Sequence, residues 1–310
     1  MDTKIKLSIG IPTYNNATGL RAELDCIISQ IKKNPELEKD VEILVSDNSD
    51  NDETKLIIEN YFSNISNLTY IKNIKNIGYD RNVDQILTKS KGIFCWTLSD
   101  NDLILDGGIE KIINIIENNT DIAHILINKD KEGGEVKIFE NMEELMKEND
   151  YKIIGGLVSQ NIFNRKYFPE DRNKYYDNLW FHLSILFEIC AKKKLILIPN
   201  LLEKKSDDVC RWAKNGTTFI TYTNLHSIIM NLKNFDYSKN FLNIYHSNFI
   251  KGLPRQTITG KLYGLKLNKK SLYTLYNHSK SDMLTFLICF FILITPVFIL
   301  NTVKNIWKKL

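Results

Sequence analysis

The first hundred residues alternate between short apolar segments and helical patterns, and this alternation restricts the fold more than any other feature of the chain. Each apolar segment runs into a polar turn, and most turns lead into a pattern with helical spacing. Strands that alternate with helices favour an α/β fold with a mostly parallel central sheet that helices flank on both faces. The predicted strands are residues 6–11, 41–45, 68–71 and 93–98, and the predicted helices are residues 17–31, 53–62 and 79–88.

The strand predicted at residues 93–98 ends in Ser99-Asp100-Asn101-Asp102, where one residue separates two carboxylates. An isolated Asp-x-Asp is common in surface turns, so on its own it is weak evidence for a site. In α/β proteins, however, ligands bind outside the carboxyl ends of parallel strands. The polar turns 12–16, 47–50 and 100–102 all follow predicted strands, so we expect them to converge. Two carboxylates there suit a divalent cation that carries phosphate oxygens.

Four motifs carry a resemblance to a known family. They are LSIGIPTYNN at residues 7–16, VEILVSDNSDND at 41–52, NIGYDRNV at 76–83 and WTLSDND at 96–102. In this order they resemble the nucleotide-binding half of family 2 inverting glycosyltransferases with the GT-A fold, and most closely the branch that includes abequosyltransferases of O-antigen assembly. The resemblance implies a GT-A domain at residues 1–200, with a nucleotide-binding half at 1–130 and an acceptor half at 131–200.

The resemblance also implies which residues bind the nucleotide-sugar donor. Pro12, Thr13 and Tyr14 would form the wall around the base, and Asp47 would accept a hydrogen bond from the edge of the base or from the ribose. An Asx-turn or a helix cap is the alternative for Asp47. Arg81 would neutralise diphosphate charge. Its alternative is a salt bridge with Asp80, Asp84 or the acidic turn.

For the metal, the resemblance implies that Asp102 is a direct ligand and that Asp100 contacts the ribose or the metal. Mg²⁺ or Mn²⁺ fits, because hard cations prefer oxygen ligands. Members of the family often carry Asp-x-Asp-Asp, whereas this chain has Ser99 before Asp100 and Asn101 between the two carboxylates. The motif therefore leaves the assignment of the metal ligands undecided by one position along the turn.

An inverting transfer needs a base that removes the proton of the acceptor hydroxyl. The segment that begins at Tyr175 predicts a helix that continues to Cys190, and it contains two candidates, Asp177 and His182. A carboxylate has the preferred chemistry, and an imidazole with an ordinary pKa near ~6.5 also serves as a base. The structural alternatives are a helix N-cap for Asp177 and a buried, hydrogen-bonded ring for His182.

The C-terminal part differs in composition from the rest. Residues 201–250 predict a helical extension. Residues 251–281 contain seven basic and no acidic residues, and the 18 residues at 283–300 (MLTFLICFFILITPVFIL) carry no charge. We expect residues 251–310 to attach the protein to membrane lipids. The apolar run is barely long enough to span a bilayer, and Pro296 could instead kink it so that it inserts from one side; a buried helix is a third possibility.

Other sequence features exclude several classes. The five cysteines lie far apart, so we expect reduced thiols, with neither a zinc site nor a disulfide framework. The N-terminus passes directly from charged residues into a strand, so we expect no secretory signal. Nucleic-acid binding would use the basic segment but would leave the apolar run unexplained, so we expect no nucleic-acid partner.

These observations together predict an enzyme that transfers a monosaccharide from a nucleoside-diphosphate sugar, with inversion, to a hydroxyl of a lipid-linked glycan. We expect it at the cytoplasmic face of the bacterial inner membrane, in surface polysaccharide synthesis such as that of O-antigen. A sugar nucleotidyltransferase is one alternative, although the chain lacks the Gly-rich basic loop expected of that class. A non-catalytic, membrane-bound module that binds nucleotide or glycan is the other.

Overall fold

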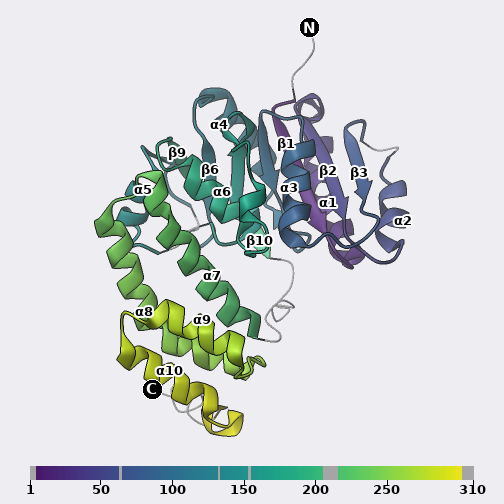
Figure 1. Cartoon of the computed structure of the whole chain (residues 1–310). Coiled ribbons are helices and arrows are strands. Elements are labelled where there is room, and N and C mark those ends of the chain that lie inside the picture. The colour runs from purple at the N-terminus through teal and green to yellow at the C-terminus, as the bar shows by residue number, and fades with distance from the viewer. Residues whose placement is uncertain (1–4, 63–64, 132, 153–154, 205–215, 302–310) are drawn as a thin grey trace. The chain divides into compact units, whose positions relative to one another are not determined.

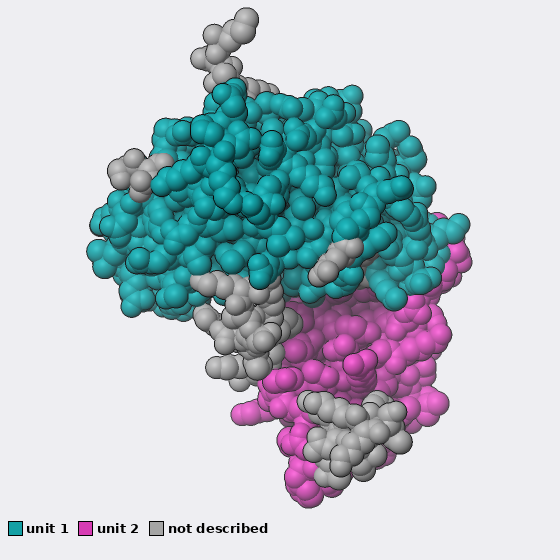
Figure 2. All heavy atoms as spheres, turned by 180° about the vertical axis from the view of Figure 1, so that it is seen from behind, with its two compact units in different colours: residues 1–207 teal, residues 208–310 magenta. Residues whose placement is uncertain are grey.

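The structure is a computed structural model that describes residues 5–62, 65–131, 133–152, 155–204 and 216–301. The chain divides into two compact units, unit 1 (Met1–Asp207) and unit 2 (Asp208–Leu310), which Figure 2 shows in teal and magenta. Cys210 and the end of the expected membrane-attachment segment, residues 302–310, lie outside the described residues. The four cysteines within the described residues are free thiols.

Unit 1 contains an eight-stranded sheet in which only β7 and β8 run against the other strands. The parallel register aligns the carboxyl ends of β1, β2 and β4 at one edge, with Thr13 beside Asp47 and Gly10 beside Thr97. The predicted α/β fold with a mostly parallel sheet is therefore confirmed. In spatial order the strands are β3 (Leu68–Lys72), β2 (Val41–Asp47), β1 (Leu7–Thr13), β4 (Phe94–Thr97), β8 (Asn161–Asn164), β6 (His124–Asn128), β9 (Leu195–Pro199) and β7 (Lys137–Phe139).

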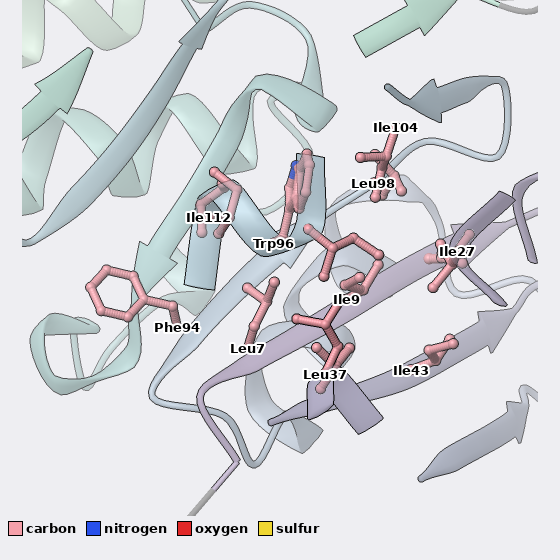
Figure 3. Packing of buried hydrophobic residues seen from close by; sticks show 14 of the residues in the cluster. Leu7, Ile9, Ile27, Leu37, Ile43, Phe94, Trp96, Leu98, Ile104 and Ile112 are labelled. Atoms are coloured by element: carbon pink, nitrogen blue, oxygen red, sulfur yellow. The ribbon is translucent and has the colours of Figure 1, made fainter. Parts of the chain in front are cut away.

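Helices cover both faces of this sheet (Figure 1). On one face, Leu7, Ile9 and Ile11 of β1 belong to a buried apolar cluster with residues of α1 and α4 (Figure 3). The opposite face of β1 presents Gly10, where an added Cβ would lie 2.0 Å from Ile86 of α3. Glycine therefore allows α3 to pack directly on the strand. The helices of unit 1 are α1 (Ala17–Lys33), α2 (Glu53–Glu59), α3 (Tyr79–Lys89), α4 (Gly108–Asn118), α5 (Met142–Glu148) and α6 (Phe181–Ile189).

A second, two-stranded sheet follows the acidic pair. β5 (Asp102–Ile104) pairs antiparallel with β10 (Leu202–Lys204), and Asp102 lies opposite Lys204. Asp102 is thus the first residue of a strand. This pairing connects the segment after β4 to the chain that follows β9.

The helix predicted to open at Tyr175 begins six residues later, so that part of the prediction is wrong. Asn173–Tyr175 is a short 3-10 helix, and α6 starts at Phe181 after Trp180 as its N-cap. Asp177 and Leu179 between them have φ angles of 66° and 65°. Non-glycine residues with such angles interrupt a right-handed helix. Asp177 therefore lies in a loop and is not the N-cap.

All the secondary-structure elements in the described part of unit 2 are helices, which confirms the predicted helical C-terminal region. α10 ends before Thr295 and Pro296, so the apolar run at 283–300 does not form one continuous helix. None of the helices in the described part of the chain combines the length and apolarity that crossing a membrane requires. The helices of unit 2 are α7 (Thr217–Asn231), α8 (Lys239–Leu262), α9 (Lys269–Ser279) and α10 (Met283–Ile294).

Candidate active site

The turns that follow β1 and β4 are bonded to each other. Thr13, the last residue of β1, donates a hydrogen bond from Oγ1 to Asp100 Oδ2 at 2.7 Å. Asn16 Nδ2 donates to the backbone oxygen of Asp100 at 3.0 Å and to Asn101 Oδ1 at 3.1 Å. A predicted donor-binding residue and a predicted metal-site residue, 87 positions apart, are thus in direct contact.

Asp102 is oriented by Ser159, a residue that sequence reasoning missed. The buried Ser159 hydroxyl donates to Asp102 Oδ2 at 2.6 Å and accepts the backbone N–H of Ser99 at 2.8 Å. The backbone oxygen of Ser159 in turn accepts from Trp96 Nε1 at 2.8 Å. The only sequence signal was its place just after the glycines Gly155 and Gly156, in a segment without a recognisable serine motif.

The donor atoms at this edge of the sheet fit a hard divalent cation. Asp100 and Asp102 are both half-buried, and each binds a neighbouring hydroxyl through one oxygen. All of these side-chain donors are oxygens, which is the set that Mg²⁺ and Mn²⁺ prefer. Within the described residues, no group of three or more His, Cys, Asp or Glu side chains is placed to hold an ion. An ion here would therefore take its other ligands from a bound diphosphate and from water.

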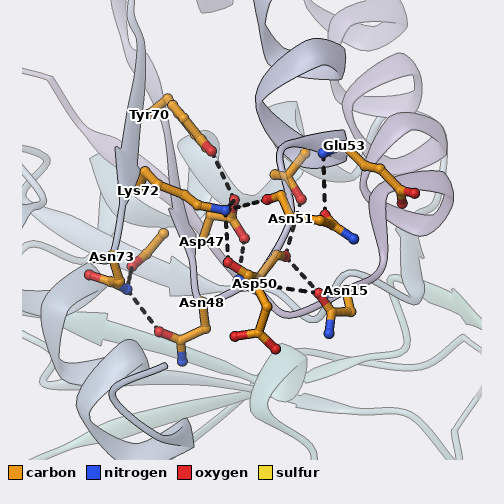
Figure 4. Close-up of polar contacts among 12 residues, drawn as sticks. Asn15, Asp47, Asn48, Asp50, Asn51, Glu53, Tyr70, Lys72 and Asn73 are labelled. Atoms are coloured by element: carbon orange, nitrogen blue, oxygen red, sulfur yellow. Dashed lines mark hydrogen bonds and ion pairs between the residues drawn. The ribbon is translucent and has the colours of Figure 1, made fainter. Parts of the chain in front are cut away.

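The acidic turn after β2 is held by the Asp47 carboxylate together with two side chains of β3 (Figure 4). The buried Asp47 carboxylate accepts from Tyr70 Oη at 2.8 Å, from Lys72 Nζ at 3.1 Å and from the backbone N–H of Ser49 at 2.7 Å. The bond to Ser49, two residues further on, is the Asx-turn considered as the alternative. Burial, followed by the bond to Asp47, raises the pKa of the Tyr70 phenol. Contact of Asp47 with a base stays a prediction.

The same acidic turn also contacts the turn after β1. Tyr14 Oη donates to Asp50 Oδ2 at 3.2 Å, and the backbone N–H of Asn15 donates to Ser49 Oγ at 2.8 Å. The Tyr14 side chain is 48% exposed, so its ring is accessible for stacking on a planar base. All three turns that the sequence predicts to converge are therefore linked by hydrogen bonds.

Arg81, near the start of α3, pairs with the candidate base Asp177. Nη1 donates to Oδ1 at 2.7 Å and Nη2 donates to Oδ2 at 3.2 Å. A salt bridge, the alternative role for Arg81, thus forms, but its partner is neither Asp80, Asp84 nor the acidic turn. Asp84 pairs instead with Arg172, at 2.6 Å. The guanidinium of Arg81 holds the pKa of the Asp177 carboxyl below its ordinary value.

Asp80 is a second residue that sequence reasoning did not place in the site. Its buried Oδ2 accepts the backbone N–H groups of Asn178 at 3.0 Å and Leu179 at 3.1 Å. Burial raises the pKa of this carboxyl. Asp80 and Arg81 therefore both hold the loop that carries Asp177, one through its backbone and one through its side chain.

His182, the other candidate base, is enclosed. Its side chain is buried on α6, with Nε2 at 3.2 Å from the Gly156 carbonyl oxygen and Nδ1 at 3.4 Å from Tyr79 Oη. A carbonyl oxygen only accepts, so Nε2 carries the proton and Nδ1 faces the tyrosine hydroxyl. Burial lowers the pKa of His182 to about 4. His182 is thus the buried, hydrogen-bonded ring that was given above as the alternative to its role as the base.

Comparison with known proteins places this geometry in a family. The model of glycosyl transferase family 2 matches residues 8–183. A GalNAc(5)-diNAcBac-PP-undecaprenol beta-1,3-glucosyltransferase from Campylobacter jejuni is 29% identical over 137 residues, which are 43% of this chain and 42% of that protein. The match thus spans less than half the length of this relative.

Two solved structures share the fold at low identity. S. aureus TarS 1–349 in complex with UDP-GlcNAc is 15% identical with a TM-score of 0.55, and the match covers 91% of this chain and 89% of TarS 1–349. The mannosyltransferase PcManGT from Pyrobaculum calidifontis, in complex with GDP-Man and Mn²⁺, is 14% identical with a TM-score of 0.54, over 100% and 90% of the two chains. These likenesses support the GT-A fold. Because the family model covers more than half of the sequence, the chain belongs to glycosyl transferase family 2.

Proposed function

We propose that this protein is a metal-dependent, inverting glycosyltransferase that moves a monosaccharide from a nucleoside-diphosphate sugar to a hydroxyl of a lipid-linked glycan. One observation carries the proposal. Side-chain hydrogen bonds join Thr13 to Asp100 and Ser159 to Asp102 beside the carboxyl ends of β1 and β4, and the backbone N–H of Ser99, next to Asp100, donates to Ser159. This is the edge where α/β folds bind their ligands, and it holds two carboxylates beside the predicted nucleotide wall.

The donor would lie across the turns that follow β1 and β2. Pro12, Thr13 and Tyr14 would flank the base, with the half-exposed Tyr14 ring as its stacking partner. Asp47 would accept from the base or ribose once a donor competes with Tyr70 for its carboxylate. Two structural relatives hold UDP-GlcNAc and GDP-Man in their solved complexes, which supports a nucleoside-diphosphate sugar as the class of donor.

Asp100 and Asp102 would hold Mg²⁺ or Mn²⁺ together with the diphosphate. Such an ion, when bound, would neutralise the negative charge that develops on the departing nucleoside diphosphate. Thr13 and Ser159 would keep the two carboxylates oriented through their hydroxyl bonds, as outer-shell partners do in other metal sites. PcManGT was solved with Mn²⁺, which supports this choice of ion.

Asp177 would act as the base. Its side chain is 75% exposed and its carboxylate is ionised at neutral pH, where a base must be able to accept a proton, and the Arg81 guanidinium lowers the pKa of this carboxyl further. His182 faces Tyr79 and Gly156 with its two ring nitrogens and is buried, so it has less access to a substrate. As the acceptor oxygen bonds to the anomeric carbon, its proton would pass to Asp177 and the bond to the diphosphate oxygen would break.

The acceptor class rests on the Campylobacter relative and on the C-terminal segment. The name of that relative describes a glucosyltransferase for a glycan linked to PP-undecaprenol, and undecaprenol is a lipid. The basic and apolar segment at 251–310 would place this enzyme at the same kind of surface, through contact with membrane lipids. We propose the cytoplasmic face of a bacterial inner membrane and a role in surface polysaccharide synthesis. An abequosyl-type sugar stays a prediction from the resemblance.

The test is turnover of a panel of nucleoside-diphosphate sugars by the purified protein with a lipid-linked glycan extract, with Mn²⁺ or Mg²⁺ and then with EDTA. We expect metal-dependent release of one nucleoside diphosphate, and a product with inverted anomeric configuration by NMR. Nucleotide binding without turnover of any donor would favour a binding module. Pyrophosphate release from a nucleoside triphosphate and a sugar phosphate would favour nucleotidyl transfer.

A further inference from the structure

Helix α10 presents an apolar face to solvent in addition to the one it buries. Its inner face includes Cys289 and Leu293, which are fully buried. Its outer face and the residues just after it expose nine large apolar side chains. The largest exposed fractions are 69% for Leu284, 59% for Phe291 and 72% for Phe298. The nine, here called the α10 apolar face, are Met283, Leu284, Leu287, Ile288, Phe291, Ile294, Val297, Phe298 and Ile299.

This face belongs to a helix that is anchored at both ends. Asp282 caps the start of α10 by accepting the backbone N–H of Thr285 at 3.1 Å. Lys261 of α8 donates to the backbone oxygen of Leu293 in the last turn. In Figure 1, α10 lies on the opposite side of α8 and α9 from α7. The apolar face is therefore preformed, and no ordering of the helix is needed before it binds a partner.

The helices that support α10 are basic. Residues 251–281 include no acidic residue, and six of their basic side chains are exposed. Tyr273 and Tyr276 of α9 are also exposed, at 68% and 47%. Tyrosines of this kind are enriched at the boundary between apolar and aqueous phases. The exposed basic residues are Lys251, Arg255, Lys266, Lys269, Lys270 and Lys280.

An exposed apolar face beside positive charge fits one kind of partner. Apolar contact and the attraction of lysine and arginine to anionic headgroups act together at a lipid surface. A second copy of the chain fits less well, because self-association through this face would bring two sets of basic side chains together. Like charges so placed oppose association.

We propose that the α10 apolar face inserts into one leaflet of an anionic bilayer, with α10 lying in the plane of the membrane. α10 has 12 residues. At 1.5 Å per residue it is about 18 Å long, much shorter than a bilayer core of about 30 Å. The break at Thr295 and Pro296 then turns the chain while Phe298 remains exposed beside the helix. This inference rests on the proposed function, since it holds the enzyme where a lipid-linked acceptor lies.

The first experiment measures binding of the full-length protein to vesicles by flotation. The vesicles contain phosphatidylcholine alone or phosphatidylcholine with phosphatidylglycerol. Replacing Leu284, Phe291 and Phe298 together by serine should weaken binding at least about tenfold, because full burial of even one large apolar side chain contributes about a tenfold factor. Replacing Lys266, Lys269 and Lys270 by glutamine should weaken binding only to the anionic vesicles.

The matched control replaces three exposed apolar residues of unit 1, Leu56, Phe62 and Ile74, by serine. Their exposed fractions are 62%, 50% and 106%, so the same chemical change is made outside the α10 apolar face. This control should bind vesicles as the wild type does. Equal loss in both triple variants, or unchanged binding of the α10 variant, would overturn the proposal.

A second measurement separates in-plane insertion from spanning. With a peptide tag on the C-terminus and protein added to sealed vesicles, protease added outside should remove the tag. Protection of the tag would show that the segment crosses the bilayer and would overturn the in-plane geometry. Donor binding should be measured on the same α10 variant. Absent nucleotide binding by the wild type would reject the proposed function, whereas retained vesicle binding by the variant would reject only this inference.

Discussion

Arg81 and Asp177, which are 96 residues apart, form an ion pair with two hydrogen bonds, Nη1 to Oδ1 at 2.7 Å and Nη2 to Oδ2 at 3.2 Å. The sequence assigned the first residue to the donor and the second to the acceptor. Their contact joins a residue predicted to bind the donor with a residue predicted to take the proton of the acceptor, at the start of α3. It also lowers the pKa of the Asp177 carboxyl, because the guanidinium favours its ionised form.

Asp177→Asn should abolish most of the turnover while leaving the donor site intact. An amide cannot take the proton of the acceptor hydroxyl, and loss of a general base costs about 10²- to 10⁴-fold in rate. We expect kcat to fall by that factor and the Kd for the nucleoside diphosphate to stay within about twofold. His182→Gln is the comparison. If His182 were the base, this second variant would lose the rate and Asp177→Asn would keep it.

Arg81→Gln should shift the acid limb of the pH–rate profile to higher pH. Arg81 holds the pKa of Asp177 below its ordinary value, so removing the guanidinium lets that pKa rise. The carboxylate is then protonated at a higher pH as the solution is acidified, and activity is lost earlier. The measurement is kcat/KM between neutral and acid pH for both proteins. An unchanged limb combined with a raised donor KM would assign Arg81 to the diphosphate alone.

Asp80→Leu should disorder the loop that presents Asp177. The substitution leaves the backbone N–H groups of Asn178 and Leu179 without the acceptor that they have now, at a cost of about 1–3 kcal/mol for each group that stays buried. The same loop holds positive φ angles at Asp177 and Leu179, which a released backbone would not keep. We expect kcat to fall with donor affinity retained, and the melting temperature to fall slightly.

Asp80→Asn is the matched variant for this prediction. Its amide oxygen can accept the same two N–H groups, so its kcat should stay near that of the wild type. A loop that needed the charge of Asp80 would instead lose activity in both variants. Full activity of Asp80→Leu would contradict a positioning role for this residue.

The sequence predicted strands β1 to β4 correctly because each of them carries its own apolar pattern and leads into a polar turn. It also predicted that the turns after β1, β2 and β4 meet, since parallel strands end at one edge. It missed Ser159 and the role of Asp80 because their bonds to Asp102 and to the 178–179 backbone join segments 57 or more residues apart. The start of α6 was predicted too early in the chain for the same reason. A distant carboxylate, absent from any local pattern, holds that loop in a non-helical conformation.

Asp102→Asn should remove the stimulation of transfer by Mn²⁺ or Mg²⁺. The substitution removes a negative oxygen from a donor set that holds only carboxylates and hydroxyls, and hard cations depend on that charge. Ser159→Ala should reduce metal affinity about 10- to 100-fold, because it removes the hydroxyl that orients Asp102. The measurement is the rate against metal concentration.

Asp106→Asn is the control for the metal prediction. Asp106 follows soon after the same turn, but its carboxylate is 70% exposed and pairs with Lys33 at 2.8 Å. Its loss should leave the metal dependence unchanged, since exposed ion pairs contribute little. Metal stimulation that survives in Asp102→Asn would move the ligand to another position of the turn, and Asn101 and Asp100 would be the next to replace.

Three histidines, one each from α7, α8 and α9, make unit 2 sensitive to acid. His226 lies between the other two, with Nδ1 at 2.8 Å from His278 Nδ1 and Nε2 at 2.9 Å from His246 Nδ1. Its ring also stacks on Phe249 at 3.8 Å. Burial, then the neighbouring imidazoles, lowers the pKa of His226 to about 3, and burial lowers that of His278. The rings of His226 and His278 are therefore best accommodated when they are neutral.

The pH dependence of stability follows from these shifts. An unfolded histidine has a pKa near ~6.5, so the unfolded state binds a proton before folded His226 does. The stabilisation is complete above that pH and falls by up to about 1.4 kcal/mol per pH unit on acidification, until the folded pKa is reached.

His226→Phe keeps the stacking on Phe249 and removes this titration, so it should lose less stability than the wild type between neutral pH and pH ~5. Urea unfolding at a series of pH values measures this. Ser227→Ala is the control, because it keeps all three rings and removes only the bond to the Thr223 carbonyl oxygen at 3.3 Å and the contact to His278 at 3.5 Å. Parallel curves for the wild type and His226→Phe would show that His226 does not carry the acid sensitivity.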